Sequence, residues 1–353
     1  MKPDKVLIQG RGAVSNPPNR FDTLWYVSEN ESTQEDDPTP GTHFLRDPSR
    51  SLVTYNDSPD VGFDASINPY RGCEHGCIYC YARPTHEYLG FSAGLDFETR
   101  ILVKEDAPAL LRQELASANW RPQVIAISGV TDPYQPVERR LRLTRQCLEV
   151  LVEFRNPVVI ITKNHLVTRD LDLLEELAHL EAAAIFLSVT TLDSRLSQVM
   201  EPRASHPLHR LAAIETLARA KVPVGVLVAP VIPGLTDHEV PSIIAACAQA
   251  GARYAGYVLL RLPHAVLPLF EEWLTHHFPE RKEKVLQRIR STRGGKLYDS
   301  RFVSRMKGEG VLAKQISSLF SLACRRAGLI GRTPKLSIGS FRGPRDRQLS
   351  LFP

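Results

Sequence analysis

The sequence lacks any apolar run of about 18 uninterrupted residues, the length that a membrane-spanning helix requires. Its first ten residues, MKPDKVLIQG, lack the apolar stretch of a secretory signal. Only six of the 353 residues are cysteine, too few for a chain held together by disulfides. Hydrophobic residues make up 43% and charged residues 24%, which excludes a disordered or collagen-like chain. We therefore expect a globular, cytoplasmic protein.

The charge is distributed unevenly along the chain. The formal net charge is +5, but residues 281–353 contain 18 Lys and Arg against four Asp and Glu, a net charge of +14. A basic surface of this kind binds phosphate backbones, because neutralised phosphates release their counterions. A solvated helix face and tail would have the same composition. Nucleic acid, DNA or RNA, is therefore one of two interpretations of this region.

The order of apolar and polar segments predicts an α/β fold. Residues 1–60 contain an acidic run, ESTQEDD, without periodicity, and are expected to form an extended, partly disordered lead-in. Short apolar runs then alternate with amphipathic segments, which indicates βαβ units and a parallel sheet. We expect strands at residues 98–104, 124–129, 157–162, 183–191, 222–230 and 254–263. The prediction is a partial (β/α)6 barrel over 61–280, a basic helical extension over 281–331 and a flexible tail over 332–353.

Ligands of such sheets lie at the carboxyl ends of the strands, in the loops that follow them. Polar, proline and glycine residues follow four of the expected strands, at 128–136, 162–164, 188–191 and 230–234. The same residue types are ordinary turn material. These loops are therefore candidate binding positions only when taken together.

Three cysteines form the strongest chemical signal. Residues 68–83 read NPYRGCEHGCIYCYAR, so Cys73, Cys77 and Cys80 have the spacing C-x3-C-x2-C without a fourth cysteine nearby. A structural zinc site needs four ligands, and an ordinary ferredoxin cluster needs four thiolates. His75 or His86 would complete a zinc site in the alternative interpretation. The three isolated cysteines, in apolar helix-like surroundings, are expected to serve packing: Cys147, Cys247 and Cys324.

This cysteine loop, with Tyr79 just before the third cysteine, resembles that of the radical SAM superfamily, and the resemblance extends from about Ser66 to Pro263. It implies that Cys73, Cys77 and Cys80 hold a 4Fe-4S cluster whose fourth iron binds S-adenosylmethionine (SAM). Reductive cleavage of SAM then gives a 5′-deoxyadenosyl radical that abstracts hydrogen from the substrate. A reductant such as flavodoxin or ferredoxin is implied as a partner.

The resemblance also implies a set of SAM-binding residues, each of which would otherwise be a turn, cap or surface residue. They are Tyr79 and the segment Val231 to Gly234 beside the adenine, Ser128, Gly129, Thr131 and Asp132 at the amino group, Ser188 at the ribose or carboxylate, and Arg203 at the carboxylate.

The sequences of two segments indicate a subgroup of the radical SAM superfamily. NPYRGCEHGCIYCYAR and TDPYQPVE resemble bacterial proteins grouped with spore photoproduct lyase and called DNA repair photolyase-like. This implies a lyase or C–H abstraction reaction on DNA. Spore photoproduct lyase returns the hydrogen through a dedicated cysteine, and no cysteine here matches it, so the radical-quenching residue is not identified. The alternatives are an RNA, peptide or small-metabolite substrate, or a non-enzymatic nucleic-acid-binding module that carries zinc or a cluster.

The C-terminus predicts a further partner. Gln348, Leu349, Ser350, Leu351 and Phe352 resemble the pentapeptide with which DNA polymerases and repair proteins bind the bacterial sliding clamp. The preceding residues are rich in Pro, Gly and Arg and are expected to act as a tether. In the alternative, the two leucines and Phe352 fold back onto the barrel.

We predict that a labelled peptide of the last 20 residues binds purified clamp and that Leu351→Ala/Phe352→Ala removes the binding, because these side chains fill the apolar pocket. Fluorescence anisotropy measures both peptides. Equal binding by the two peptides, or no binding by either, contradicts the prediction.

Overall fold

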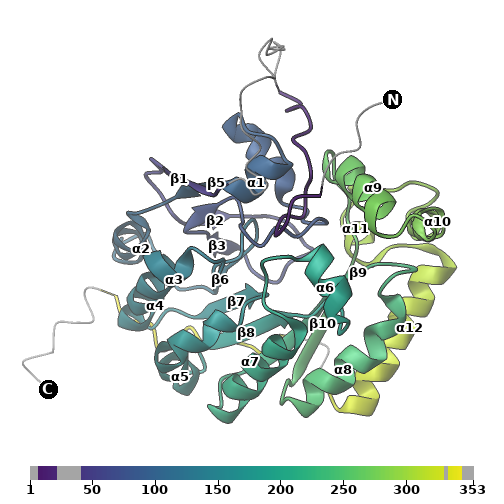
Figure 1. Ribbon diagram of the computed structural model, residues 1–353. Coiled ribbons are helices and arrows are strands. Elements are labelled where there is room, and N and C mark those ends of the chain that lie inside the picture. Colours follow the sequence, from purple (N-terminus) through teal and green to yellow (C-terminus); the bar gives the residue numbers. More distant parts are fainter. Residues whose placement is uncertain (1–6, 22–40, 330–332, 344–353) are drawn as a thin grey trace, which may run out of the picture.

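The computed structural model describes residues 7–21, 41–329 and 333–343, and its centre is a seven-stranded sheet (Figure 1). The strand order is β10-β9-β8-β7-β6-β3-β2, in which β2 is antiparallel to β3 and every other neighbouring pair is parallel. The strands are β2 (Thr54–Tyr55), β3 (Ala65–Ile67), β6 (Ile125–Ile127), β7 (Val158–Thr162), β8 (Ala183–Ser188), β9 (Val224–Val231) and β10 (Tyr254–Leu259). The six parallel strands confirm the partial barrel, which is not closed.

One expected strand belongs to a different sheet. The segment 98–104 forms β5 (Arg100–Val103), which pairs with β1 (His43–Arg46) and β4 (Tyr70–Arg71) in a separate three-stranded sheet. The first parallel strand of the barrel is β3, which spans only three residues and is followed by β4 and then by the cysteine loop. Three residues are too few to show the periodicity that predicts a strand.

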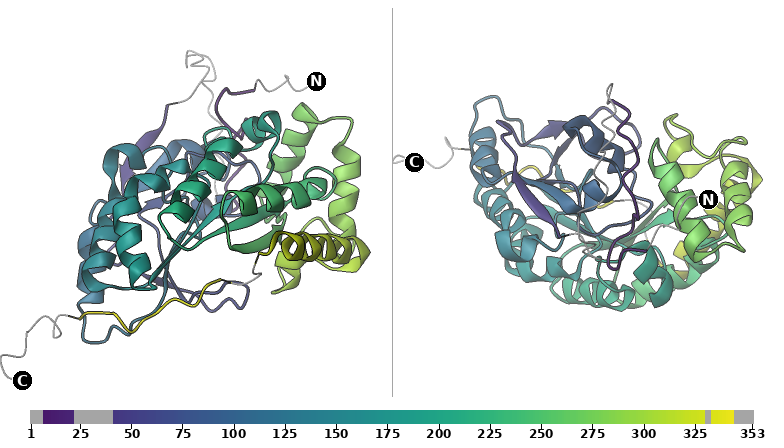
Figure 2. Two further views of the ribbon diagram at one scale, coloured as in Figure 1. Left: turned by 90° about the horizontal axis from the view of Figure 1, so that it is seen from below. Right: turned by 45° about the horizontal axis from the view of Figure 1, so that its top comes forward.

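Helices cover the outer face of the large sheet, and Figure 2 shows them as an arc with the N-terminal segments inside it. The longer helices are α2 (Ala107–Leu115), α4 (Leu143–Phe154), α5 (Leu171–His179), α7 (Pro207–Arg219), α8 (Val240–Gln249), α9 (Val266–His277), α10 (Lys282–Ser291) and α12 (Gly310–Ala327). The shorter ones are α1 (Leu95–Thr99), α3 (Glu138–Leu141), α6 (Ser194–Met200), α11 (Ser304–Lys307) and the 3-10 helices η1 (Arg83–Leu89), η2 (His165–Asp170) and η3 (Asp237–Glu239).

Two apolar clusters hold these elements together. The larger lies between the sheet and α2, α4, α5, α7, α8 and α12, and it contains the three isolated cysteines. All six residues of β8 are buried, as expected for a central strand covered on both faces. The second cluster joins Ile78 and Tyr79 of the cysteine loop to Phe270 and Trp273 of α9 and to Val285 of α10. The C-terminal helices are therefore part of the support of the cysteine loop.

Parts of the predicted lead-in pack against the barrel. Residues 7–21 lie on the cysteine loop and α1, where Leu95 N donates to Ser15 O at 3.2 Å and Asn19 Nδ2 donates to Glu87 O at 2.8 Å. The remaining residues of the lead-in, 1–6 and 22–40 with the acidic run, lie outside the described residues. The predicted domain boundaries stay a prediction.

The C-terminal region crosses the molecule twice. Residues 293–307 lie along β10 and reach the loop after β2, where Val303 N donates to Asp60 Oδ1 at 2.6 Å. Residues 333–343 run under the sheet (Figure 2), held by backbone bonds from Ser337 N to Glu181 O and from Arg342 N to Phe154 O, each 2.8 Å long. The clamp-like pentapeptide, 348–352, lies outside the described residues. Among the residues that are described, no helix combines the length and apolarity needed to cross a membrane.

We predict that Gly225→Ala in β9 lowers the free energy of unfolding by about 1–3 kcal/mol, since a Cβ there overpacks the sheet. That atom would lie 2.5 Å from the Phe186 ring of β8 and 2.9 Å from Tyr254 Cβ of β10. Gly62→Ala is the control, because a Cβ at Gly62 has no neighbour within 4 Å. Urea denaturation measures both variants, and equal stability of the two would contradict the packing argument.

Candidate functional site

The cysteine loop, residues 72–81, lies across the carboxyl ends of the parallel strands. His75 Nε2 is 3.1 Å from the side-chain amide nitrogen of Asn164, which follows β7. The Tyr79 hydroxyl is 3.2 Å from Oγ1 of Thr190, which follows β8. The loop therefore occupies the edge at which parallel sheets bind their ligands.

The three cysteine side chains of the loop are free thiols. Cys73 and Cys77 are buried and Cys80 is half-buried. Gly76, between the first two, has φ of 67°, a conformation that favours glycine. A Cβ at this position would also lie 2.8 Å from the Glu98 carboxylate. Position 76 is thus restricted to glycine, both by its backbone conformation and by the lack of space for a Cβ.

A buried ion pair supports the loop from beneath. Arg83 and Glu98 form a salt bridge in which both side chains are fully buried. Arg83 Nε also donates to Cys77 O at 3.1 Å. The Glu98 carboxylate accepts bonds from Gly12 N at 3.0 Å and Ala13 N at 2.9 Å. The N-terminal segment is thereby attached to the backbone that carries the second cysteine.

The surroundings of the thiols hold them protonated in the absence of a metal. Burial, followed by the Asp132 charge, raises the pKa of Cys73, and burial with the Glu201 charge raises the pKa of Cys77 to about 12. Burial also raises the pKa of Cys80. A thiolate is the form that binds metal, and bound metal ions favour it by supplying positive charge. Three free thiols in one loop, two of them buried, therefore fit a cationic iron–sulfur core.

The zinc alternative is not supported by the histidines. His75 Nδ1 lies 3.4 Å from Asp132 Oδ2, and its other ring nitrogen contacts an amide. His86 Nε2 lies 3.0 Å from Arg100 O, and burial lowers its pKa to about 4. No group of three or more His, Cys, Asp and Glu among the described residues converges on one metal ion. In a multinuclear cluster each cysteine binds a different iron, so the sulfurs need not converge on one point.

Asp132, predicted to contact the SAM amino group, follows β6 as an ionised carboxylate. It accepts bonds from Thr162 Oγ1 at 2.6 Å and from Lys163 N at 2.8 Å. Burial raises its pKa, but His75 and these two donors outweigh burial and bring the pKa to about 2. A permanent anion at this edge is chemically suited to an ammonium group.

Tyr79, the predicted neighbour of the adenine, is fixed by a buried polar network. Its hydroxyl donates to the Glu201 carboxylate, which also accepts a bond from Thr190 Oγ1 at 2.8 Å. Glu201 forms a buried salt bridge with Arg210, whose Nη1 donates to Ser188 O at 3.0 Å. The network thus joins the cysteine loop to the end of β8, where the predicted residue Ser188 lies.

The other predicted residues of the β6 loop lie at the same edge. Gly129 O accepts a 2.6 Å bond from the hydroxyl of Tyr81, the residue after the third cysteine. Thr131 is buried, with its hydroxyl 3.4 Å from Tyr70 O, and Ser128 is half-buried. The structure therefore brings Ser128, Gly129, Thr131 and Asp132 together beside the cysteine loop.

Arg203, Val231 and Gly234 are the remaining predicted residues. Arg203 is half-buried, and its guanidinium lies 3.2 Å from the Glu74 carboxylate. Val231 is buried at the end of β9, and Gly234 lines a cavity of about 640 Å³ with residues of α10 and α12, including Arg288. Arg203 N also donates to His75 O at 3.2 Å, so Arg203 is bonded to two residues of the cysteine loop. The SAM contacts predicted for Arg203, Val231 and Gly234 stay predictions.

Sequence reasoning missed the charged residues that hold this edge together. They are Arg83, Glu98, Glu201 and Arg210. Lys163, whose ammonium lies 5.8 Å from the centroid of the Tyr79 ring, belongs to the candidate loop 162–164. The signal that was available is the segment MEPRAS, which contains Glu201 two residues before the predicted Arg203.

The sequence has relatives among known proteins. An uncharacterized protein of Mycobacterium tuberculosis, Rv2578c, is 38% identical over 220 residues, which are 62% of this chain and 65% of the relative. A radical SAM Nalpha-GlyT isomerase of Pseudomonas phage M6 is 25% identical over 172 residues, which are 48% of this chain and 34% of the isomerase. The chain thus spans less than two thirds of the length of either relative.

The fold resembles that of solved spore photoproduct lyase structures. A mutant of that enzyme with a dinucleoside spore photoproduct superimposes with a TM-score of 0.52 at 16% identity, over 81% of this chain and 80% of the enzyme. This likeness shows a shared fold. The sequence profile of the Radical SAM superfamily matches residues 67–247, which include the cysteine loop and the strands from β4 to β9. Since the match covers half of the 353 residues, the chain belongs to the radical SAM superfamily, whose cofactors are a 4Fe-4S cluster and SAM.

Proposed function

We propose that this protein is a radical SAM enzyme that acts on DNA, in repair or modification, and that Cys73, Cys77 and Cys80 are its cluster ligands. The observation that carries the proposal is the placement of three free thiols, two buried and one half-buried, on the ligand-binding edge of a partial barrel. When bound, the cluster and SAM supply one-electron cleavage of SAM and abstraction of a hydrogen atom from the substrate. A flavodoxin or ferredoxin is the proposed source of the electron.

The protein's own residues position the cofactors. The Arg83–Glu98 pair holds the cysteine loop, and the Glu201 network fixes the Tyr79 ring in a buried setting beside it. The Asp132 carboxylate, kept ionised, is proposed to meet the SAM ammonium group. Ser188 and the β6 loop extend the same edge. Apolar strands behind this edge exclude water from the reacting atoms.

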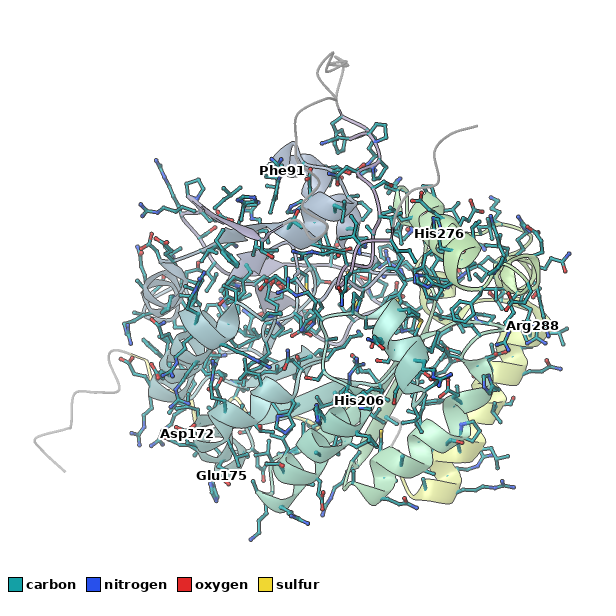
Figure 3. All side chains as sticks on the ribbon, in the orientation of Figure 1. Phe91, Asp172, Glu175, His206, His276 and Arg288 are labelled. Carbon is teal, nitrogen blue, oxygen red and sulfur yellow. The ribbon has the colours of Figure 1, made fainter. Side chains whose placement is uncertain are left out.

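Two observations support DNA as the substrate class. The first is that the phage relative is named an Nalpha-GlyT isomerase and that the structural neighbour holds a dinucleoside spore photoproduct. The second is that the C-terminal region is strongly basic. Figure 3 shows Arg288 of this region at the right of the molecule and the acidic residues Asp172 and Glu175 of α5 at the lower left. A basic face beside the site favours approach of a polyanion.

The reaction is proposed as hydrogen abstraction without the cysteine-mediated return step of spore photoproduct lyase. Cys147 is buried in α4, Cys247 in α8 and Cys324 in α12. All three pack into the core between the sheet and the helices, and none follows a strand. A hydrogen donor at a strand end would have to be another kind of residue.

We predict that changing any one of Cys73, Cys77 or Cys80 to Ala abolishes iron loading and SAM cleavage, because two thiolates do not retain the cluster. Iron and sulfide content and 5′-deoxyadenosine release with dithionite measure both properties after anaerobic reconstitution. Cys247→Ala is the matched control, since that thiol is equally buried but packs in the core. Full iron content and SAM turnover in Cys77→Ala would refute the ligand assignment.

The basic region predicts salt-dependent binding to DNA, and the structure decides which arginines can test it. Arg293 is buried and donates to the carbonyl of Leu260 at 2.7 Å, so its replacement would damage the fold. Arg281 and Lys284 are exposed at α10. They are the cleaner sites for charge reversal.

We predict that Arg281→Glu/Lys284→Glu weakens duplex binding and reduces the slope of log K against log salt by roughly 0.9 for each phosphate that the variant no longer neutralises. The control is Arg219→Glu/Arg253→Glu, an equal reversal at two exposed sites, the last residue of α7 and the residue before β10. Fluorescence anisotropy at several salt concentrations gives both slopes. The same slope in both double variants would remove the basic region from the binding surface.

A further inference from the structure

Arg261 lies at the opening of the partial barrel, two residues beyond the end of β10. Its guanidinium stacks on the ring of Tyr81, 4.8 Å from the ring centroid. Tyr81 directly follows the third cysteine and is 47% exposed. The Arg261 side chain is therefore placed between the cysteine loop and solvent.

Tyr81 connects two distant strands of the sheet at this opening. Its hydroxyl donates to Gly129 O in the loop after β6, and its ring carries the guanidinium that follows β10. In the sheet, β6 and β10 are separated by β7, β8 and β9. A group bound at Arg261 would thus sit over the carboxyl edge of the barrel, next to the predicted SAM loop.

Three arginines gather in this region, and two of them have their donors engaged. Arg293 donates to the carbonyls of Ser304, Leu259 and Leu260. Arg305 forms a salt bridge with Asp60 and donates to Ser58 Oγ at 2.7 Å.

Arg261 differs from both. Its hydrogen bond within the described chain is a weak one, from Nη1 to the thioether of Met306 at 3.7 Å. Its Nε is buried without a hydrogen-bond partner among the described residues. Among the described residues, Arg261 also forms no salt bridge. Its charged guanidinium therefore keeps N–H donors that no protein group uses.

A guanidinium of this kind is suited to an anion with two oxygens in one plane, because its parallel N–H groups bind both. We propose that Arg261 binds a backbone phosphate of the DNA substrate and so holds the target nucleotide over the cysteine loop. This inference rests on the proposed function and adds to it the residue that positions the substrate. The neighbouring Tyr81 ring keeps the guanidinium in its plane by stacking.

The SAM carboxylate is the competing source of an anion. Arg203, the residue predicted for it, is already paired with Glu74. The test must therefore separate a phosphate of the substrate from the carboxylate of the cofactor.

The experiment uses the reconstituted full-length protein and a radiolabelled thymidine dinucleotide as probe, joined either by a phosphodiester or by an uncharged methylphosphonate. Equilibrium dialysis gives the affinity for each probe, and SAM affinity is measured in parallel. The variants are Arg261→Gln and Arg261→Lys. Arg253→Gln is the control, because it removes the same charge from an exposed position at the amino end of the same strand.

We expect the wild-type protein and Arg253→Gln to prefer the phosphodiester by about tenfold or more, the usual value of a charge-assisted bond. Arg261→Gln loses that preference and keeps its SAM affinity, and Arg261→Lys keeps part of it. An unchanged preference in Arg261→Gln overturns the inference, and a selective loss of SAM affinity assigns Arg261 to the cofactor instead. If the wild-type protein cleaves SAM but binds neither dinucleotide, the DNA substrate itself is wrong.

Discussion

The buried ion pair between Arg83 and Glu98 is the interaction on which the cysteine loop depends. The Arg83 guanidinium satisfies carbonyls of the loop and of residues 93–94, while Glu98 receives two backbone N–H groups of the N-terminal segment. A buried pair is tolerated when its remaining donors and acceptors are bonded, and removal of one partner costs about 3–5 kcal/mol. The positions of the thiols thus depend on a buried ion pair that bonds to the backbone of the loop and not to the cysteine side chains.

The sequence predicts the parallel part of the fold well because the signal is local. Five of the six expected strands lie in the large sheet, since each is a buried apolar run followed by an amphipathic helix. The exception, β5, has the same local pattern but pairs with β1 and β4. Partner choice is a tertiary property, and neither the three-residue β3 nor the packing of residues 7–21 on the loop has a periodic signal.

The residues of the candidate site likewise fall into those with a local sequence signal and those that depend on tertiary contacts. Motif spacing singles out Cys73, and the rule that ligands lie at strand ends singles out the candidates Asp132 and Ser188, which do lie at the carboxyl edge of the sheet. Arg203 carries the right chemistry in sequence, but its side chain is paired with Glu74, a contact between segments more than a hundred residues apart. Residues such as Glu201 and Arg210 act through the buried network around Tyr79, and such residues are recognised only when their partners are known.

The open side of the barrel gives the site its access. The edge strands β2 and β10 are joined by the segment 293–307, through the salt bridge of Arg305 with Asp60 and the bond from Lys307 Nζ to Tyr257 O. These two contacts are made by side chains of the segment 293–307. Pairing of β2 with β10 would instead close the barrel with a continuous ladder of backbone hydrogen bonds. An opening between β2 and β10 accounts for an exposed Tyr81 beside a buried cysteine loop. The proposed large substrate requires such an unsealed edge, and the core behind the edge is apolar.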